Sequence, residues 1–90
     1  LADDARYGLA ESYYARKRYD EAIEEYDRVI DVDPVGQKAP PAMLKLGLCY
    51  RSLQNNASAR KAWEDLIIQF PDAEEAKVAR QRLDDLRTSR

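Results

Sequence analysis

Apolar residues recur along the chain at the three- and four-residue spacing of amphipathic helices, in five separate segments. No segment alternates apolar and polar residues as a half-buried strand would. Prolines and asparagines separate the segments, so an all-α chain is predicted. We expect helices from about 2 to 15, from about 20 to 32, from about 38 to the Asn55–Asn56 turn, from that turn to Phe70, and from Asp72 onward.

The polar residues at the breaks predict how the later helices begin. Asn55 or Asn56 is expected to cap the fourth segment, and Asp72 the fifth, with Glu75 three residues further on. Pro40 and Pro41 fit the first turn of the third helix, where a missing N–H is tolerated. The apolar stripes predict these core residues: Leu9, Ala10, Tyr13; Ala22, Ile23, Tyr26, Val29, Ile30; Met43, Leu46, Gly47, Tyr50, Leu53; Ala59, Ala62, Trp63, Leu66, Ile67, Phe70; Ala76, Ala79, Leu83, Leu86.

The same pattern returns with a period of 37 residues, which is typical of a helical solenoid. Leu9, Tyr13, Ala22, Tyr26 and Pro34 come back as Leu46, Tyr50, Ala59, Trp63 and Pro71, and Ala39, Ala42 and Leu46 come back as Ala76, Ala79 and Leu83. We therefore expect one domain over 1–90, with one repeat over about 1–34, a second over about 38–71, and a capping helix over about 72–88. Small residues at equivalent positions, such as Gly47, are expected where two helices approach closely.

Composition argues against several classes of function. The 90 residues carry a net charge of only −2, too little positive charge to hold nucleic acid. No apolar run is long enough to insert into a membrane. Histidine is absent and the glycines are scattered, so no catalytic site, metal site or cofactor is expected. The single cysteine, Cys49, lies inside a predicted helix and is expected to be a core or half-buried thiol. Because the chain begins with leucine, we expect a fragment of a longer protein, in which homo-oligomerisation would use regions outside the fragment.

The chain resembles the tetratricopeptide repeat family. Both repeats carry the family's pattern of small, aromatic and proline positions: Leu9-Ala10, Tyr13, Tyr19, Ala22, Tyr26, Pro34, then Leu46-Gly47, Tyr50, Ala59, Trp63, Pro71. The resemblance implies helix-turn-helix units that stack into a solenoid and bind other proteins. The period is longer than the family's usual 34 residues.

A narrower resemblance is to the C-terminal repeats of the Tol-Pal system family YbgF, also called the cell division coordinator CpoB. It rests on residues 39–50, 59–64, 70–71 and 76–83. It implies a periplasmic protein of Gram-negative bacteria that binds TolA and links outer-membrane constriction to septal wall synthesis. The BamD-type outer-membrane assembly lipoproteins share the longer repeat, so a scaffold domain of that kind is an alternative, and a module attached to an enzyme is another.

The tetratricopeptide resemblance also implies a partner-binding groove lined by the first helix of each unit. By position, the candidate groove residues are Tyr7, Glu11, Tyr14, Leu44, Leu48, Arg51, Val78 and Gln81. Leu44 and Leu48 lie off the core stripe and should be partly exposed, unless a neighbouring helix covers them. We expect an apolar centre with Glu11 and Arg51 at the rim. The alternative is that Leu44 packs on Val78 of the capping helix and that the tyrosines only snorkel, with their hydroxyl groups reaching water.

Overall fold

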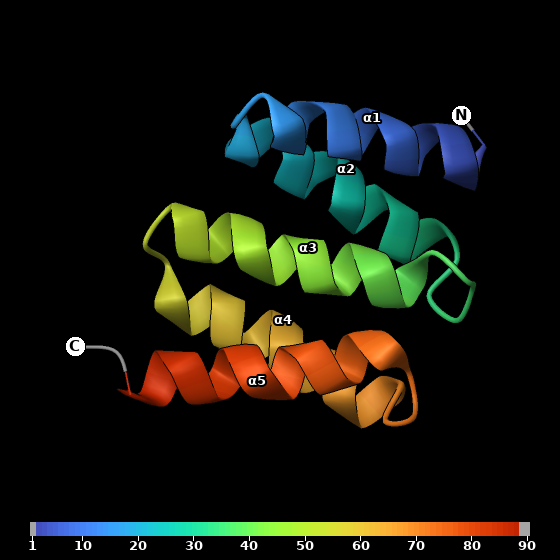
Figure 1. Cartoon of the computed structure of the whole chain (residues 1–90). Helices are drawn as coiled ribbons and strands as arrows, with labels where there is room; N and C mark the ends of the chain where they lie inside the picture. Colours follow the sequence, from blue (N-terminus) through green and yellow to red (C-terminus); the bar gives the residue numbers. More distant parts are fainter. Residues whose placement is uncertain (1, 89–90) are drawn as a thin grey trace.

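The computed structural model describes residues 2–88, and within them the chain forms five helices (Figure 1). The helices are α1 (Asp3–Ala15), α2 (Tyr19–Val32), α3 (Ala39–Ser52), α4 (Asn56–Gln69) and α5 (Glu74–Thr88). No strand occurs in the described part, and the helix bounds lie within a few residues of those predicted. The predicted all-α class is therefore confirmed.

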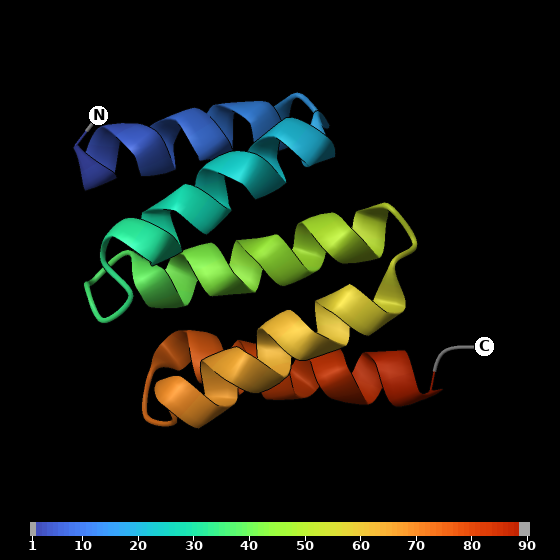
Figure 2. The same ribbon diagram turned by 180° about the vertical axis from the view of Figure 1, so that it is seen from behind.

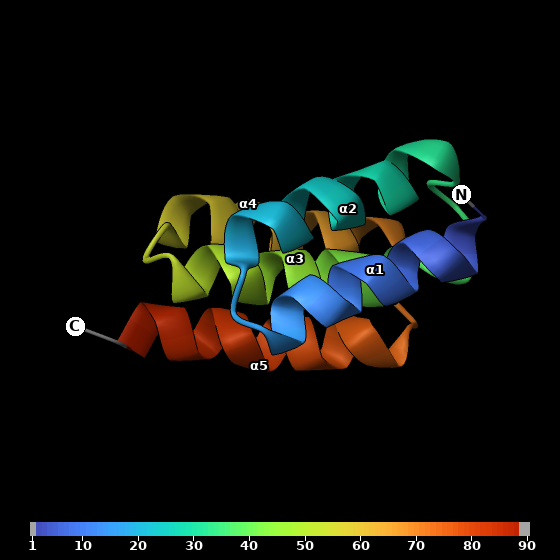
Figure 3. The same cartoon turned by 90° about the horizontal axis from the view of Figure 1, so that it is seen from above.

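The helices stack as two helical hairpins followed by a single helix. α1 packs against α2 and α3 against α4, while α2 contacts α3 and α4 contacts α5. Viewed from above, α1, α3 and α5 form one layer and α2 and α4 the other (Figure 3). The view from behind shows α2 and α4 crossing over the first layer (Figure 2). This is the helical solenoid that the 37-residue period predicts.

The predicted stripes meet in two neighbouring cores. The first joins α1, α2 and α3, and the second joins α3, α4 and α5. Tyr26 and Trp63, which are equivalent in the two repeats, are the largest fully buried side chains. Most other predicted core residues are buried or half-buried. Leu53 is an exception: it is 43% exposed because α3 ends one residue before it.

Gly47 of α3 lies directly against the side chain of Trp63 of α4. A Cβ atom added to Gly47 would overlap the indole ring of Trp63. The indole Nε1–H donates a hydrogen bond to the carbonyl oxygen of Leu44 at 3.2 Å. The expectation that a small residue at this position allows close helix packing is confirmed.

The turns between helices follow the sequence signals only in part. Asn55 caps α4, and its side chain accepts a hydrogen bond from the backbone N–H of Ser58 at 3.2 Å. The predicted cap at Asp72 is wrong: α5 begins at Glu74, so Asp72 lies in the turn. That turn is held by backbone hydrogen bonds, with Ala73 N–H donating to the carbonyl of Phe70 and Ala76 N–H to that of Ala73.

Candidate functional site

The layer of first helices, α1, α3 and α5, carries all the candidate groove residues. In the view from above, α1, α3 and α5 lie on one side of the stack and α2 and α4 on the other (Figure 3). Tyr7, Glu11, Tyr14, Leu44, Leu48 and Arg51 are half-buried, whereas Val78 and Gln81 are exposed.

Tyr7 and Tyr14 stand on α1 and pack against aromatic residues of α2. The ring of Tyr7 meets that of Tyr26 edge to face at 5.8 Å between centroids, and Tyr14 meets Tyr19 at the same distance. Such contacts fix the orientation of the rings. The two tyrosines therefore support the first core as well as presenting an edge to solvent.

Two lysines that sequence reasoning missed lie over these tyrosines. The ammonium group of Lys45 is 4.5 Å from the ring centroid of Tyr14, and that of Lys38 is 5.1 Å from the ring of Tyr7. Both distances lie within the range of cation–π attraction. Each lysine also forms an ion pair with α1, Lys45 with Glu11 at 3.6 Å and Lys38 with Asp4 at 3.7 Å.

Glu11, predicted at the rim of the groove, has partners within the fold. It accepts a hydrogen bond from the Tyr26 hydroxyl and pairs with Lys45. Burial and this hydrogen bond raise the pKa of Tyr26, so the phenol stays protonated and keeps donating. The charge of Glu11 is therefore satisfied within the fold, and it opposes an acidic ligand less than an unpaired carboxylate would.

Leu44 and Leu48 are partly exposed, as expected from their place off the core stripe, and are also partly covered by neighbouring residues. Leu44 and Leu48 are half-buried and pack against the second core, which includes Ala79 and Leu86 of α5. The part that stays accessible is apolar, and Val78, 40% exposed, extends the apolar surface on α5. Arg51 forms no ion pair with any residue of 2–88, so its guanidinium is available to a ligand.

Charged residues of α5 shift the pKa values of two tyrosines on α1. Burial raises the pKa of Tyr7 to about 12, and the carboxylates of Glu11 and Glu75 add to that shift. Burial also raises the pKa of Tyr14, and the Arg82 guanidinium acts in the opposite direction. Glu75 and Arg82 therefore lie near enough to these tyrosines to act on them electrostatically, and neither was a sequence candidate.

Comparison with protein families agrees with this architecture. Two family models, both described as tetratricopeptide repeat, match residues 3–34 and 41–73, which together make up more than two thirds of the chain. The chain belongs to the tetratricopeptide repeat family. A comparison with curated proteins finds no match. Tetratricopeptide repeats generally mediate protein–protein interaction, and a protein partner is the functional class that this membership supports.

A pocket of this tetratricopeptide protein lies away from the candidate groove residues. A shallow pocket of about 240 Å³ opens between α2, α3 and α4, lined among others by Asp27, Tyr50, Lys61 and Asp65. Lys61 and Asp65 pair with each other at 3.1 Å. Burial, then the nearby carboxylate of Asp31, raises the pKa of Asp27. The pocket is polar at its edge, and none of the candidate groove residues lines it.

Among residues 2–88, no three His, Cys, Asp or Glu side chains gather into a group that could hold a metal ion. Cys49 is fully buried, and burial raises the pKa of its thiol to about 12, which suppresses the reactive thiolate. None of the described helices combines the length and apolar character needed to cross a bilayer.

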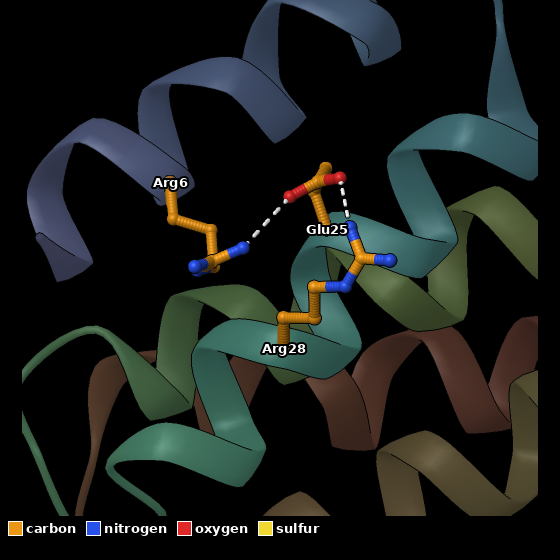
Figure 4. A network of polar contacts seen from close by, with 3 residues as sticks. All are labelled: Arg6, Glu25 and Arg28. Atoms are coloured by element: carbon orange, nitrogen blue, oxygen red, sulfur yellow. Dashed lines mark hydrogen bonds and ion pairs between the residues drawn. The ribbon is translucent and has the colours of Figure 1, made fainter. Parts of the chain in front are cut away.

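Within the first repeat, an ion-pair network ties α1 to α2 and so fixes one wall of the groove (Figure 4). Glu25 of α2 is buried, and its two carboxylate oxygens bind Arg6 of α1 at 3.3 Å and Arg28 at 2.6 Å. A buried carboxylate needs such partners to offset its lost hydration. The network holds α1 at a set angle to α2, and with it the two groove tyrosines.

Proposed function

We propose that the layer formed by α1, α3 and α5 binds a segment of a partner protein. The observation that carries this proposal is the row of aromatic, apolar and cationic groups left accessible there, from Tyr7 and Tyr14 through Leu48 and Arg51 to Val78. Tyrosine and arginine are the side chains most often found as binding anchors. The proposed role is binding without catalysis.

The pairing of the groove charges indicates which segments would bind. Lys38 and Lys45 are each paired with a carboxylate of α1, so the surface beside the tyrosines has little net charge. Affinity would then come from apolar and aromatic contacts, with Arg51 as a cationic anchor. An extended or helical segment with apolar side chains and an acidic residue placed to meet Arg51 would fit.

For the partner itself, the residues shared with the YbgF and CpoB repeats support TolA. These residues lie in α3, α4, α5 and the turn before α5, and they include the groove positions Leu44, Leu48 and Val78. On this proposal the protein works in the periplasm, beside the Tol-Pal system, and coordinates outer-membrane constriction with septal wall synthesis.

Titration of a labelled TolA fragment into the chain tests both parts. Val78→Asp should weaken binding by about tenfold or more, because it places a charge in the apolar part of the groove. Ile68→Asp is the matched control: Ile68 is also apolar and is 76% exposed, but it lies on α4 in the other layer. Both side chains are accessible, so both variants should keep the helical signal and the melting temperature.

The results distinguish an error in the proposed binding surface from an error in the proposed partner. If Ile68→Asp weakens binding and Val78→Asp does not, the groove is not the binding surface. If the parent chain does not bind the TolA fragment at all, TolA is not the partner. Arg51→Glu gives a second test of the groove, since it reverses the charge of the proposed anchor and should also weaken binding.

A further inference from the structure

The first helix of each unit carries the same three positions, spaced 37 residues apart. In α3 and α5 these positions face the second helix of the preceding unit and are buried or half-buried against it. They are Ala42, Leu46 and Cys49 in α3, which pack with residues of α2, and Ala79, Leu83 and Leu86 in α5, which pack with residues of α4. This shared surface is how one unit stacks on the next.

α1 carries the same surface, and within residues 2–88 no second helix of a preceding unit packs on it. The equivalent residues are Ala5, Leu9 and Ser12. Ala5 and Ser12 are exposed and Leu9 is half-buried, and Ala10 is the one buried residue of α1. α1 lies at one end of the stack, and no helix within residues 2–88 covers this side of it (Figure 1).

At the opposite end of the stack, the outer face of α5 carries charged residues. The positions where α3 packs on α4 include Met43, Gly47 and Tyr50, and their equivalents in α5 are Arg80, Asp84 and Arg87. All three α5 residues are exposed. A terminal helix of a solenoid needs such a polar outer face. α5 therefore has the polar outer face of a terminal helix, whereas α1 keeps the small and apolar residues of an internal helix.

We propose that the α1 face of Ala5, Leu9 and Ser12 is a stacking surface that receives the second helix of a further tetratricopeptide unit. Such a helix presents a small residue, an aromatic ring and a β-branched residue, as α2 does with Ala22, Tyr26 and Val29. A second copy of the chain does not offer a free helix of this kind. In each copy α3 already covers α2, and α5 already covers α4.

A fusion that supplies the missing helix tests the proposal. A copy of residues 1–37 placed directly before Leu1 keeps the 37-residue period, so its second helix meets α1 as α2 meets α3. We expect the melting temperature to rise by about 5 °C or more, since a solenoid gains stability from each new interface. Backbone amides of the original α1 should also exchange more slowly.

Ala5→Arg supplies the matched control, made in both the 90-residue chain and the fused chain. In the 90-residue chain Ala5 is exposed, so the melting temperature should change by no more than about 2 °C. In the fused chain the same substitution should remove the gain. Ala42→Arg, at the equivalent buried position of α3, should lower the melting temperature of the 90-residue chain strongly.

Any of four results would overturn the proposal. The fused chain could show no gain, or a gain that Ala5→Arg leaves intact. Ala5→Arg could destabilise the 90-residue chain as strongly as Ala42→Arg. Sedimentation could show that the 90-residue chain dimerises and that Ala5→Arg separates the dimer, which would make the face a contact between copies.

Discussion

Gly47 leaves the space that the indole ring of Trp63 fills. The ring is fully buried, and any Cβ atom on Gly47 would overlap it. Because Trp63 also donates a hydrogen bond to the Leu44 carbonyl one turn earlier, the pair fixes both the spacing and the register of α3 and α4. Leu44 and Leu48, on the groove side of α3, are positioned by the same contact.

This relationship predicts a measurable coupling between the two positions. Gly47→Ala should lower the free energy of unfolding by about 1–3 kcal/mol through overpacking, and Trp63→Ala by about 3–5 kcal/mol through the lost ring and its cavity. In the double variant the new methyl group enters the cavity, so its loss should be smaller than the sum of the two. Urea unfolding of the four chains measures the difference. Strict additivity would mean that the two residues do not share this space.

The Glu25 network predicts that burial, rather than distance, decides how much an ion pair contributes to the free energy of unfolding. Arg28 lies nearer to Glu25 than Arg6 does, but its side chain is 55% exposed against 18% for Arg6. Arg28→Ala should cost less than about 1 kcal/mol, as exposed pairs do. Arg6→Ala should cost about 2 kcal/mol, less than a fully broken buried pair because Arg28 still neutralises Glu25. Equal costs in urea unfolding would contradict this.

The helices could be predicted from the sequence because their signals are local. Apolar spacing, Pro34 and Pro71 placed the segments, and the 37-residue period placed the small residue Gly47 where two helices approach closely. The α5 start could not be predicted in the same way. The turn before it is closed by the carbonyls of Phe70 and Ala73, and backbone hydrogen bonds of this kind leave no mark in residue type.

The groove could be predicted only as a set of positions. Matching to a repeat family identified the helix face that carries Tyr7, Tyr14 and Leu48. It missed Lys38 and Lys45, whose long side chains reach across to rings and carboxylates of α1. Those contacts depend on the angle and distance between helices, which residue spacing within one helix does not determine.

Buried protons in the first core predict that stability falls in alkaline solution. Burial raises the pKa of Cys49 from 9.0 to about 12 and that of Tyr7 from 10.0 to about 12, and it also raises the pKa of Tyr26. Above about pH 9 the unfolded chain loses these protons while the folded chain keeps them, so rising pH favours unfolding. The stabilisation is complete below pH 9 and is lost as pH rises toward 12.

Urea unfolding at about pH 8 and about pH 10.5 measures this loss. The free energy of unfolding should be lower at the higher pH, and Cys49→Ala should reduce the difference because it removes the group that titrates first. A free energy that rises with pH over this range would contradict the assignment of buried, protonated groups.

The turns between the helices of each hairpin predict two stabilising substitutions. Lys17 and Gln54, which lie 37 residues apart, are the non-glycine residues of the described chain with positive φ, at 61° and 63°. This left-handed conformation costs a residue with a Cβ atom about 1–2 kcal/mol, while glycine adopts it freely but loses more entropy on folding. Lys17→Gly and Gln54→Gly should therefore each raise the free energy of unfolding by up to about 1 kcal/mol. Both side chains are exposed, so little packing is lost. Lys17→Ala and Gln54→Ala are the controls, since alanine keeps the Cβ atom. If each glycine variant unfolds at the same urea concentration as its alanine counterpart, the backbone conformation is not the source of the effect.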